Sequence, residues 1–127
     1  MSDLSAQEKA LHCARFADDK KAEDIVILDV RELVSFTDFF VICSGLSEPQ
    51  LKAITGSIQV GMKSDFACRP FAADGIPSSQ WLVLDYVDVV VHIFLKERRM
   101  FYGLEDVWSD APHVAWAPEQ PSKENVL

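Results

Sequence analysis

The longest apolar run of the chain is interrupted by a short polar break, a pattern that predicts a β-hairpin. Residues 81–84 and 89–95 are rich in Val, Ile, Phe and Trp, which strands favour, and an aspartate stands at each end of the break between them. Because side chains alternate between the two faces of a strand, Trp81, Val83 and Asp85 share one face. The run is too short and too interrupted to cross a bilayer as a helix, so we expect no membrane attachment.

Two capping boxes predict the helices of the first half of the chain. In this motif a Ser or Thr precedes the helix and a Glu or Gln follows three positions later, so that each side chain accepts a backbone N–H from the other residue. The motif residues are Ser5 with Glu8, and Ser47 with Gln50. They predict helices over residues 6–18 and from residue 48 to about 66. Apolar residues at helical spacing should pack the second helix on the sheet: Leu51, Ile54, Ile58 and Met62.

The remaining apolar segments complete a single sheet with one more helix. Residues 25–28 and 38–44 have the composition of strands, and the short link between them favours antiparallel pairing. We expect a short edge strand at 69–72 and a last helix at 96–108. The apolar side of that helix would consist of Phe101, Leu104 and either Val107 or Trp108. The pattern predicts an α/β fold, a single β-sheet flanked by helices.

Length and composition indicate one folded domain followed by a tail. The chain has 127 residues, enough for one domain with a core of its own. From residue 111 onward, Pro112, Pro118 and Pro121 stand among polar residues. We therefore expect a domain over residues 1–110 and a disordered tail over 111–127.

Charge and cysteine content indicate which partners the protein can bind and in which cellular compartment it resides. The net charge of −8 argues against wrapping a phosphate backbone, so no direct, sequence-specific nucleic-acid binding is expected. The same charge is compatible with a basic protein as partner. The alternative interpretation is that the charge serves only to keep the chain soluble. Cys13, Cys43 and Cys68 form no paired motif, which favours free thiols in a reducing cytoplasm. The N-terminus lacks the pattern of a signal peptide, so we expect a cytoplasmic protein.

A predicted strand ends at Ser44-Gly45, and a predicted helix follows it. This arrangement resembles the phosphate-binding turn of nucleotidyltransferases. Those enzymes need paired carboxylates on one strand face to hold Mg²⁺. Asp85 and Asp88 are the nearest pair, but they lie across the expected turn. We therefore predict no catalytic residue, no metal site and no cofactor, and His92 is interpreted as a core residue with its hydrogen bonds satisfied. A nucleotidyltransferase-like enzyme stays as the alternative.

The first strand of the hairpin and the break that follows it supply the candidate binding site. Trp dominates binding hot spots, and an aromatic residue among carboxylates suits an apolar pocket surrounded by Lys or Arg. The candidate partner-binding residues are Trp81, Val83, Asp85, Tyr86 and Asp88. The alternative interpretation of Trp81 is a core anchor.

Several blocks of the chain together resemble the ribosomal silencing factor family, RsfS, also called Iojap-like. The first block covers residues 19–31, and the second covers 37–45 with Ser47 and Gln50. The third and longest block is 81–94, WLVLDYVDVVVHIF, and 101–105 with Trp108 completes the match. In the family, Gly usually follows the Asp-Tyr pair, where this chain has Val87. Since a β-branched residue resists positive φ, we expect αR-type angles or a longer loop at this turn.

The resemblance implies a mixed sheet of nucleotidyltransferase-like topology without catalytic carboxylates. It also implies a translational repressor that binds the large ribosomal subunit through ribosomal protein fourteen. The bound factor would sterically block subunit joining, especially under nutrient limitation. A homodimer is expected as well, and a dimerisation module without a ribosomal role is a further alternative.

Overall fold

The computed structural model describes residues 4–116, and it gives no description of the side chains at positions 77, 100–102 and 104. The elements in chain order are α1 (Ala6–Asp18), β1 (Glu23–Asp29), β2 (Phe39–Gly45), α2 (Glu48–Phe66), β3 (Ala72–Asp74), the short 3-10 helix η1 (Pro77–Ser79), β4 (Trp81–Asp85), β5 (Val89–Leu95), α3 (Lys96–Tyr102), α4 (Leu104–Val107) and β6 (His113–Val114). No helix of this described part is both long and apolar enough to cross a membrane.

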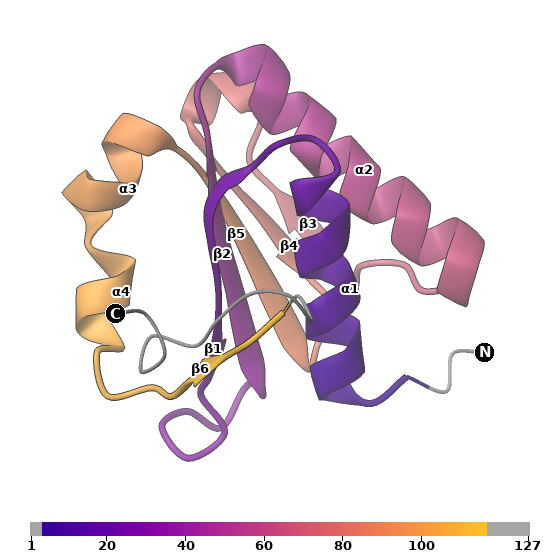
Figure 1. Ribbon diagram of the computed structural model, residues 1–127, viewed down its shortest axis with the longest axis vertical. Coiled ribbons are helices and arrows are strands. Elements are labelled where there is room, and N and C mark those ends of the chain that lie inside the picture. The colour runs from indigo at the N-terminus through magenta and orange to yellow at the C-terminus, as the bar shows by residue number, and fades with distance from the viewer. Residues whose placement is uncertain (1–3, 117–127) are drawn as a thin grey trace, which may run out of the picture.

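The strands form one mixed sheet in the order β3-β4-β5-β2-β1-β6. The central strands β2 and β5 are parallel, whereas the pairs β1–β2, β4–β5, β3–β4 and β1–β6 are antiparallel. Figure 1 shows the sheet between two layers, with α1 and α2 on one side and α3 and α4 on the other. The expected α/β fold, a single mixed sheet flanked by helices, is confirmed.

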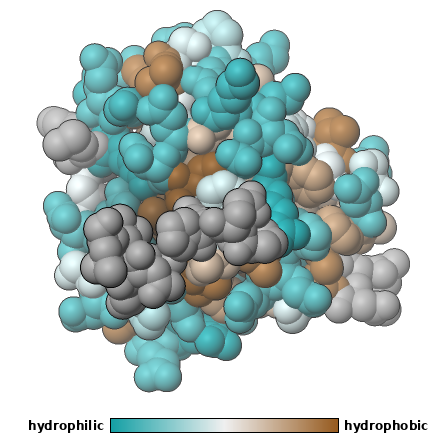
Figure 2. All heavy atoms as spheres, viewed as in Figure 1, coloured by the Kyte–Doolittle hydropathy of each residue, from teal (hydrophilic) through white to brown (hydrophobic). Residues whose placement is uncertain are grey.

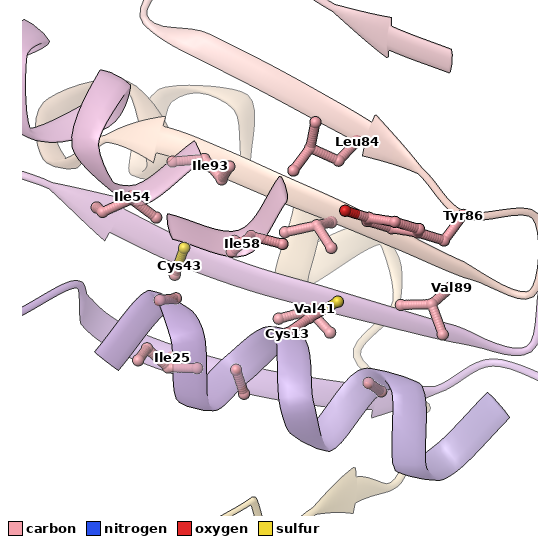
Figure 3. Packing of buried hydrophobic residues seen from close by; sticks show 14 of the residues in the cluster. Cys13, Ile25, Val41, Cys43, Ile54, Ile58, Leu84, Tyr86, Val89 and Ile93 are labelled. Carbon is pink, nitrogen blue, oxygen red and sulfur yellow. The ribbon is translucent and has the colours of Figure 1, made fainter. Parts of the chain in front are cut away.

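The larger core lies between the sheet and the helices α1 and α2 (Figure 3). The predicted apolar stripe of α2 is fully buried there: Leu51, Ile54, Ile58 and Met62. Gly61 lets the two helices approach closely, since a Cβ at this position would lie 2.5 Å from the ring of Phe16. The layer therefore depends on a small residue on α2 as well as on the apolar stripe.

The capping residues act as the sequence predicts, with one difference. At α1, Oγ of Ser5 accepts the N–H of Glu8 and the Glu8 carboxylate accepts the N–H of Ser5, at 3.1 and 2.9 Å. At α2, Ser47 accepts the N–H of Gln50 at 3.2 Å, but the Gln50 side chain accepts the N–H of Leu46 instead of that of Ser47. The second motif is therefore a half capping box.

Burial keeps two of the three cysteines, Cys13 and Cys43, in the thiol form. All three are unpaired, as expected, and two of them are buried. Burial raises the pKa of Cys43 to about 12 and raises that of Cys13 as well. Both side chains are thus held as thiols and fill the core as small apolar groups.

The prediction of one continuous helix over 96–108 is wrong, because this segment forms two helices. Gly103 adopts a left-handed conformation with φ 60° and ends α3, and α4 begins at the next residue. Val107 is exposed, whereas Trp108 packs on the second face of the sheet. The short edge strand lies at Ala72–Asp74 rather than at 69–72.

Residues 111–116 do not behave as the expected disordered tail. The strand β6 pairs with β1, and the N–H of Asp29 donates to the carbonyl of Pro112 at 2.8 Å. The indole N–H of Trp116 donates to the carbonyl of Ile25 at 3.1 Å. The composition argument averaged over the whole segment and overlooked these apolar residues. The rest of the expected tail, residues 117–127, lies outside the described part.

Candidate protein-binding face

The second face of the sheet carries an apolar cluster that includes part of the predicted site. The side chains of Trp81 and Val83 pack at its margin, on the side opposite to α1 and α2. Its buried members are Leu28, Val30, Phe40, Ile42, Val90, Phe94 and Ala111. We call the β4–β5 part of this side, formed by Trp81, Val83, Asp85, His92 and Phe94, the hairpin face.

Trp81 is half-buried and is held by two neighbours on β5. Its ring stacks on Phe94, which pairs with it across the strands, with ring centroids 4.9 Å apart and planes at 28°. Its indole Nε1–H donates to Nδ1 of His92 at 3.2 Å. Trp81 is therefore neither a full core residue nor a loose surface side chain, because it is oriented by the sheet and keeps an accessible part.

His92 is buried within the hairpin face, with 8% of its surface exposed. Desolvation lowers the pKa of its imidazole to about 4, so the ring is neutral near pH 7. Phe40 meets the ring edge-on at 5.2 Å between centroids. The expectation of a satisfied core histidine is confirmed for Nδ1 only, since Nε2 is buried without a hydrogen-bond partner among the described residues.

The turn of the hairpin contradicts the expectation of αR-type angles or a longer loop. Val87 has φ 77°, in the region that glycine favours. The N–H of Asp88 donates to the carbonyl of Tyr86 at 3.0 Å, the bond of a γ-turn centred on Val87. Oδ1 of Asp85 accepts the N–H of Val87 at 2.8 Å and supports the turn from within. The register pairs Asp85 with Val90, so the connection between the strands is short, and this constraint overrides the preference of the valine.

Tyr86 and Asp88 do not join the other predicted site residues. Tyr86 points into the core against α1 and α2, with 3% of its surface exposed, and its burial raises the pKa of the phenol (Figure 3). Asp88 forms an ion pair with Lys9 of α1 at 2.7 Å. The structure therefore brings together Trp81, Val83 and Asp85.

Sequence reasoning missed two residues of the hairpin face, His92 and Phe94. Strand alternation combined with the pairing of the hairpin could have identified them, because Phe94 lies opposite Trp81 and His92 lies opposite Val83 on the same face of the sheet. The same alternation places Tyr86 on the other face, together with Leu82 and Leu84.

A hollow of about 580 Å³ lies near the carboxyl ends of the parallel strands β2 and β5. The buried Arg99 reaches Oγ of Ser44 at 2.9 Å and the carboxylate of Glu105 at 2.8 Å, which ties α3 and α4 to the end of β2. The lining includes two cations, Lys96 and Arg99, and three carboxylates, Asp18, Asp24 and Glu105. This mixed charge selects neither an anion nor a cation.

Figure 2 shows the side of the molecule on which β6 and α1 lie in front of the sheet, with hydrophobic side chains near its centre and hydrophilic ones around them. Within residues 4–116, no group of three or more His, Cys, Asp or Glu side chains is placed to hold a metal ion.

Comparison with known proteins gives consistent matches. The model of a family described as "RsfS: Ribosomal silencing factor during starvation" matches residues 3–126. A protein from Halalkalibacterium halodurans named ribosomal silencing factor RsfS is 38% identical over 112 residues, which are 87% of this chain and 94% of that protein. A protein of the same name from Bacillus subtilis is 38% identical over 99 residues, which are 78% of this chain and 83% of that one.

A solved structure agrees with these matches. The crystal structure of a protein from Chromobacterium violaceum is similar with a TM-score of 0.79 and 29% sequence identity. The similarity covers 94% of this chain and 92% of that chain.

Proposed function

The chain belongs to the ribosomal silencing factor family, RsfS, and we propose that it represses translation by binding the large ribosomal subunit. The contact is made with ribosomal protein fourteen, and the bound protein sterically blocks subunit joining, especially when nutrients are short. The family is described as a ribosomal silencing factor during starvation, and the two relatives carry the name ribosomal silencing factor. The partner and the steric mechanism rest on the family resemblance of the sequence blocks described above.

The observation that carries the proposal is the half-buried Trp81 on the hairpin face. Trp offers a large contact area with few rotatable bonds, so its burial in a partner pocket contributes about 2–4 kcal/mol. Val83 extends the apolar contact along the same strand, and Asp85 places a carboxylate beside it. A basic partner would meet this carboxylate with Lys or Arg.

Charge favours a protein contact over a contact with ribosomal RNA. The net charge of −8 opposes approach to a phosphate backbone and favours approach to a basic ribosomal protein. We propose that the protein acts by occupancy and not by catalysis, in the bacterial cytoplasm, and that it self-associates as a homodimer. Binding by occupancy requires only that the protein stays on the subunit face where the small subunit docks.

A subunit-joining assay tests this function. Isolated bacterial large subunits are incubated with the protein, small subunits are added in Mg²⁺, and free and joined subunits are separated on a sucrose gradient. We expect the protein to keep the subunits apart and Trp81→Ala to restore joining. Val60→Ala is the matched control, because Val60 is exposed on α2 at the opposite side of the sheet, and it should block joining like the wild type. Joining that is unaffected by the wild-type protein would refute the proposal.

A further inference from the structure

We propose that His92 is a positioning residue of the hairpin face, whose Nδ1 fixes the indole of Trp81 in the orientation that the partner binds. The inference rests on the proposed function, in which Trp81 makes the partner contact. His92 itself is too buried to supply contact area, so its effect on binding passes through Trp81.

The geometry of the two strands makes this coupling direct. Trp81 lies opposite Phe94 in the register, and His92 lies opposite Val83, so the imidazole is the diagonal neighbour of the indole. Stacking on Phe94 restrains the plane of the indole, but it allows the ring to slide and turn within that plane. The bond from Nε1 to Nδ1 of His92 adds a directional restraint at one edge of the ring.

The bond also defines the protonation state that His92 must have. Indole Nε1–H is a donor only, so Nδ1 of His92 must accept and the proton of the neutral imidazole is on Nε2. Burial among apolar side chains favours this neutral ring, and Phe40 packs edge-on against it. The imidazole is therefore a fixed acceptor in an apolar surrounding, where a hydrogen bond has its strongest orienting effect.

An oriented Trp81 binds more tightly because less side-chain freedom is lost on association. Loss of the restraint should weaken binding to isolated large ribosomal subunits about three- to tenfold, the factor expected for immobilising one large side chain. The whole contact of Trp81 should be worth more than this, since its removal also deletes the buried area.

A matched pair of variants separates the acceptor from simple packing. In His92→Asn the side-chain carbonyl can occupy the place of Nδ1 and accept from the indole, whereas His92→Leu has similar size and no acceptor. We expect His92→Asn to bind large subunits within about twofold of the wild type and His92→Leu to bind about three- to tenfold more weakly. His92→Leu removes the acceptor of the indole N–H, but it also removes the buried Nε2 that lacks a partner within the described chain, so the two effects offset each other and it should fold about as stably as the wild type.

Two further measurements identify the route through Trp81. The Nε1–H resonance of Trp81, assigned by its absence in Trp81→Phe, should move upfield and exchange faster with solvent in His92→Leu but not in His92→Asn. In the Trp81→Phe background, which lacks the donor, His92→Leu should cause no further loss of binding. Additive losses in that double variant, or an unchanged indole resonance in His92→Leu, overturn the positioning role.

Failure of this inference is distinct from failure of the proposed function. If Trp81→Ala abolishes binding while His92→Leu binds like the wild type, only the positioning role is refuted. If Trp81→Ala itself binds large subunits normally, the contact assigned to Trp81 is refuted and the role of His92 falls with it.

Discussion

Replacing Val87 by glycine should stabilise the protein, because the hairpin turn holds a β-branched residue at φ 77°. A residue with a Cβ pays about 1–3 kcal/mol for such a conformation, and glycine adopts it freely. Against this, glycine makes the unfolded chain more flexible, which costs about 0.4–1 kcal/mol. Val87 exposes 61% of its surface, so little apolar burial is lost.

The balance is a gain of about 1 kcal/mol in the free energy of unfolding, or roughly 3–5 °C in the melting temperature of a domain of this size. Chemical and thermal unfolding of Val87→Gly and the wild type measure it. Val60→Gly is the control, since it makes the same replacement at an exposed position of α2 and should destabilise by about 0.5 kcal/mol. If both variants lose stability to the same extent, Val87 is not strained and the tight turn is wrongly described.

Further predictions concern the C-terminal strand β6, the buried His92, the carboxylate of Asp85 and the homodimer. Ending the chain at residue 111 should cost about 2–4 kcal/mol, because β6 and the docked Trp116 are lost, whereas a chain ending at residue 116 is the matched control. The pKa of His92 is lowered to about 4, so between pH 6.5 and 4 the unfolded chain holds the extra proton and stability falls as the pH falls. Chemical unfolding at pH 6.5 and pH 5 should show a loss of about 1.5 kcal/mol in the wild type beyond that in His92→Asn. Asp85→Asn keeps the acceptor for the turn but should slow association with large subunits and reduce its salt dependence, measured by stopped-flow. If the homodimer uses the hairpin face, dimer formation should compete with large subunits for this face. The affinity of the protein for large subunits should then weaken as the protein concentration rises.

Elements with strong local signals could be predicted from the sequence. The hairpin strands and α2 follow from strand composition, helical spacing and a Ser cap, all of which act over a few residues. The break at Gly103 was missed because a glycine within an apolar helical pattern also fits a continuous helix. The pairing of β6 was missed because its partners, Ile27 and Leu28, lie far away in the sequence.

The candidate site was predictable only in part, for similar reasons. Trp81, Val83 and Asp85 were grouped correctly by strand alternation, which also excludes Tyr86 from their face. The pairing of Asp88 with Lys9 spans 79 residues, so no local pattern reveals it. The φ of Val87 depends on the strand register, and residue preference alone pointed the wrong way.

Co-sedimentation with isolated large ribosomal subunits tests the central claim most directly. We expect the wild type and Val60→Ala to sediment with large subunits and not with small subunits. Trp81→Ala should bind about thirtyfold more weakly, the factor for about 2 kcal/mol, while its thermal unfolding shows that the fold is retained. A wild-type protein that stays in the supernatant, or a folded Trp81→Ala that sediments like the wild type, would contradict the account.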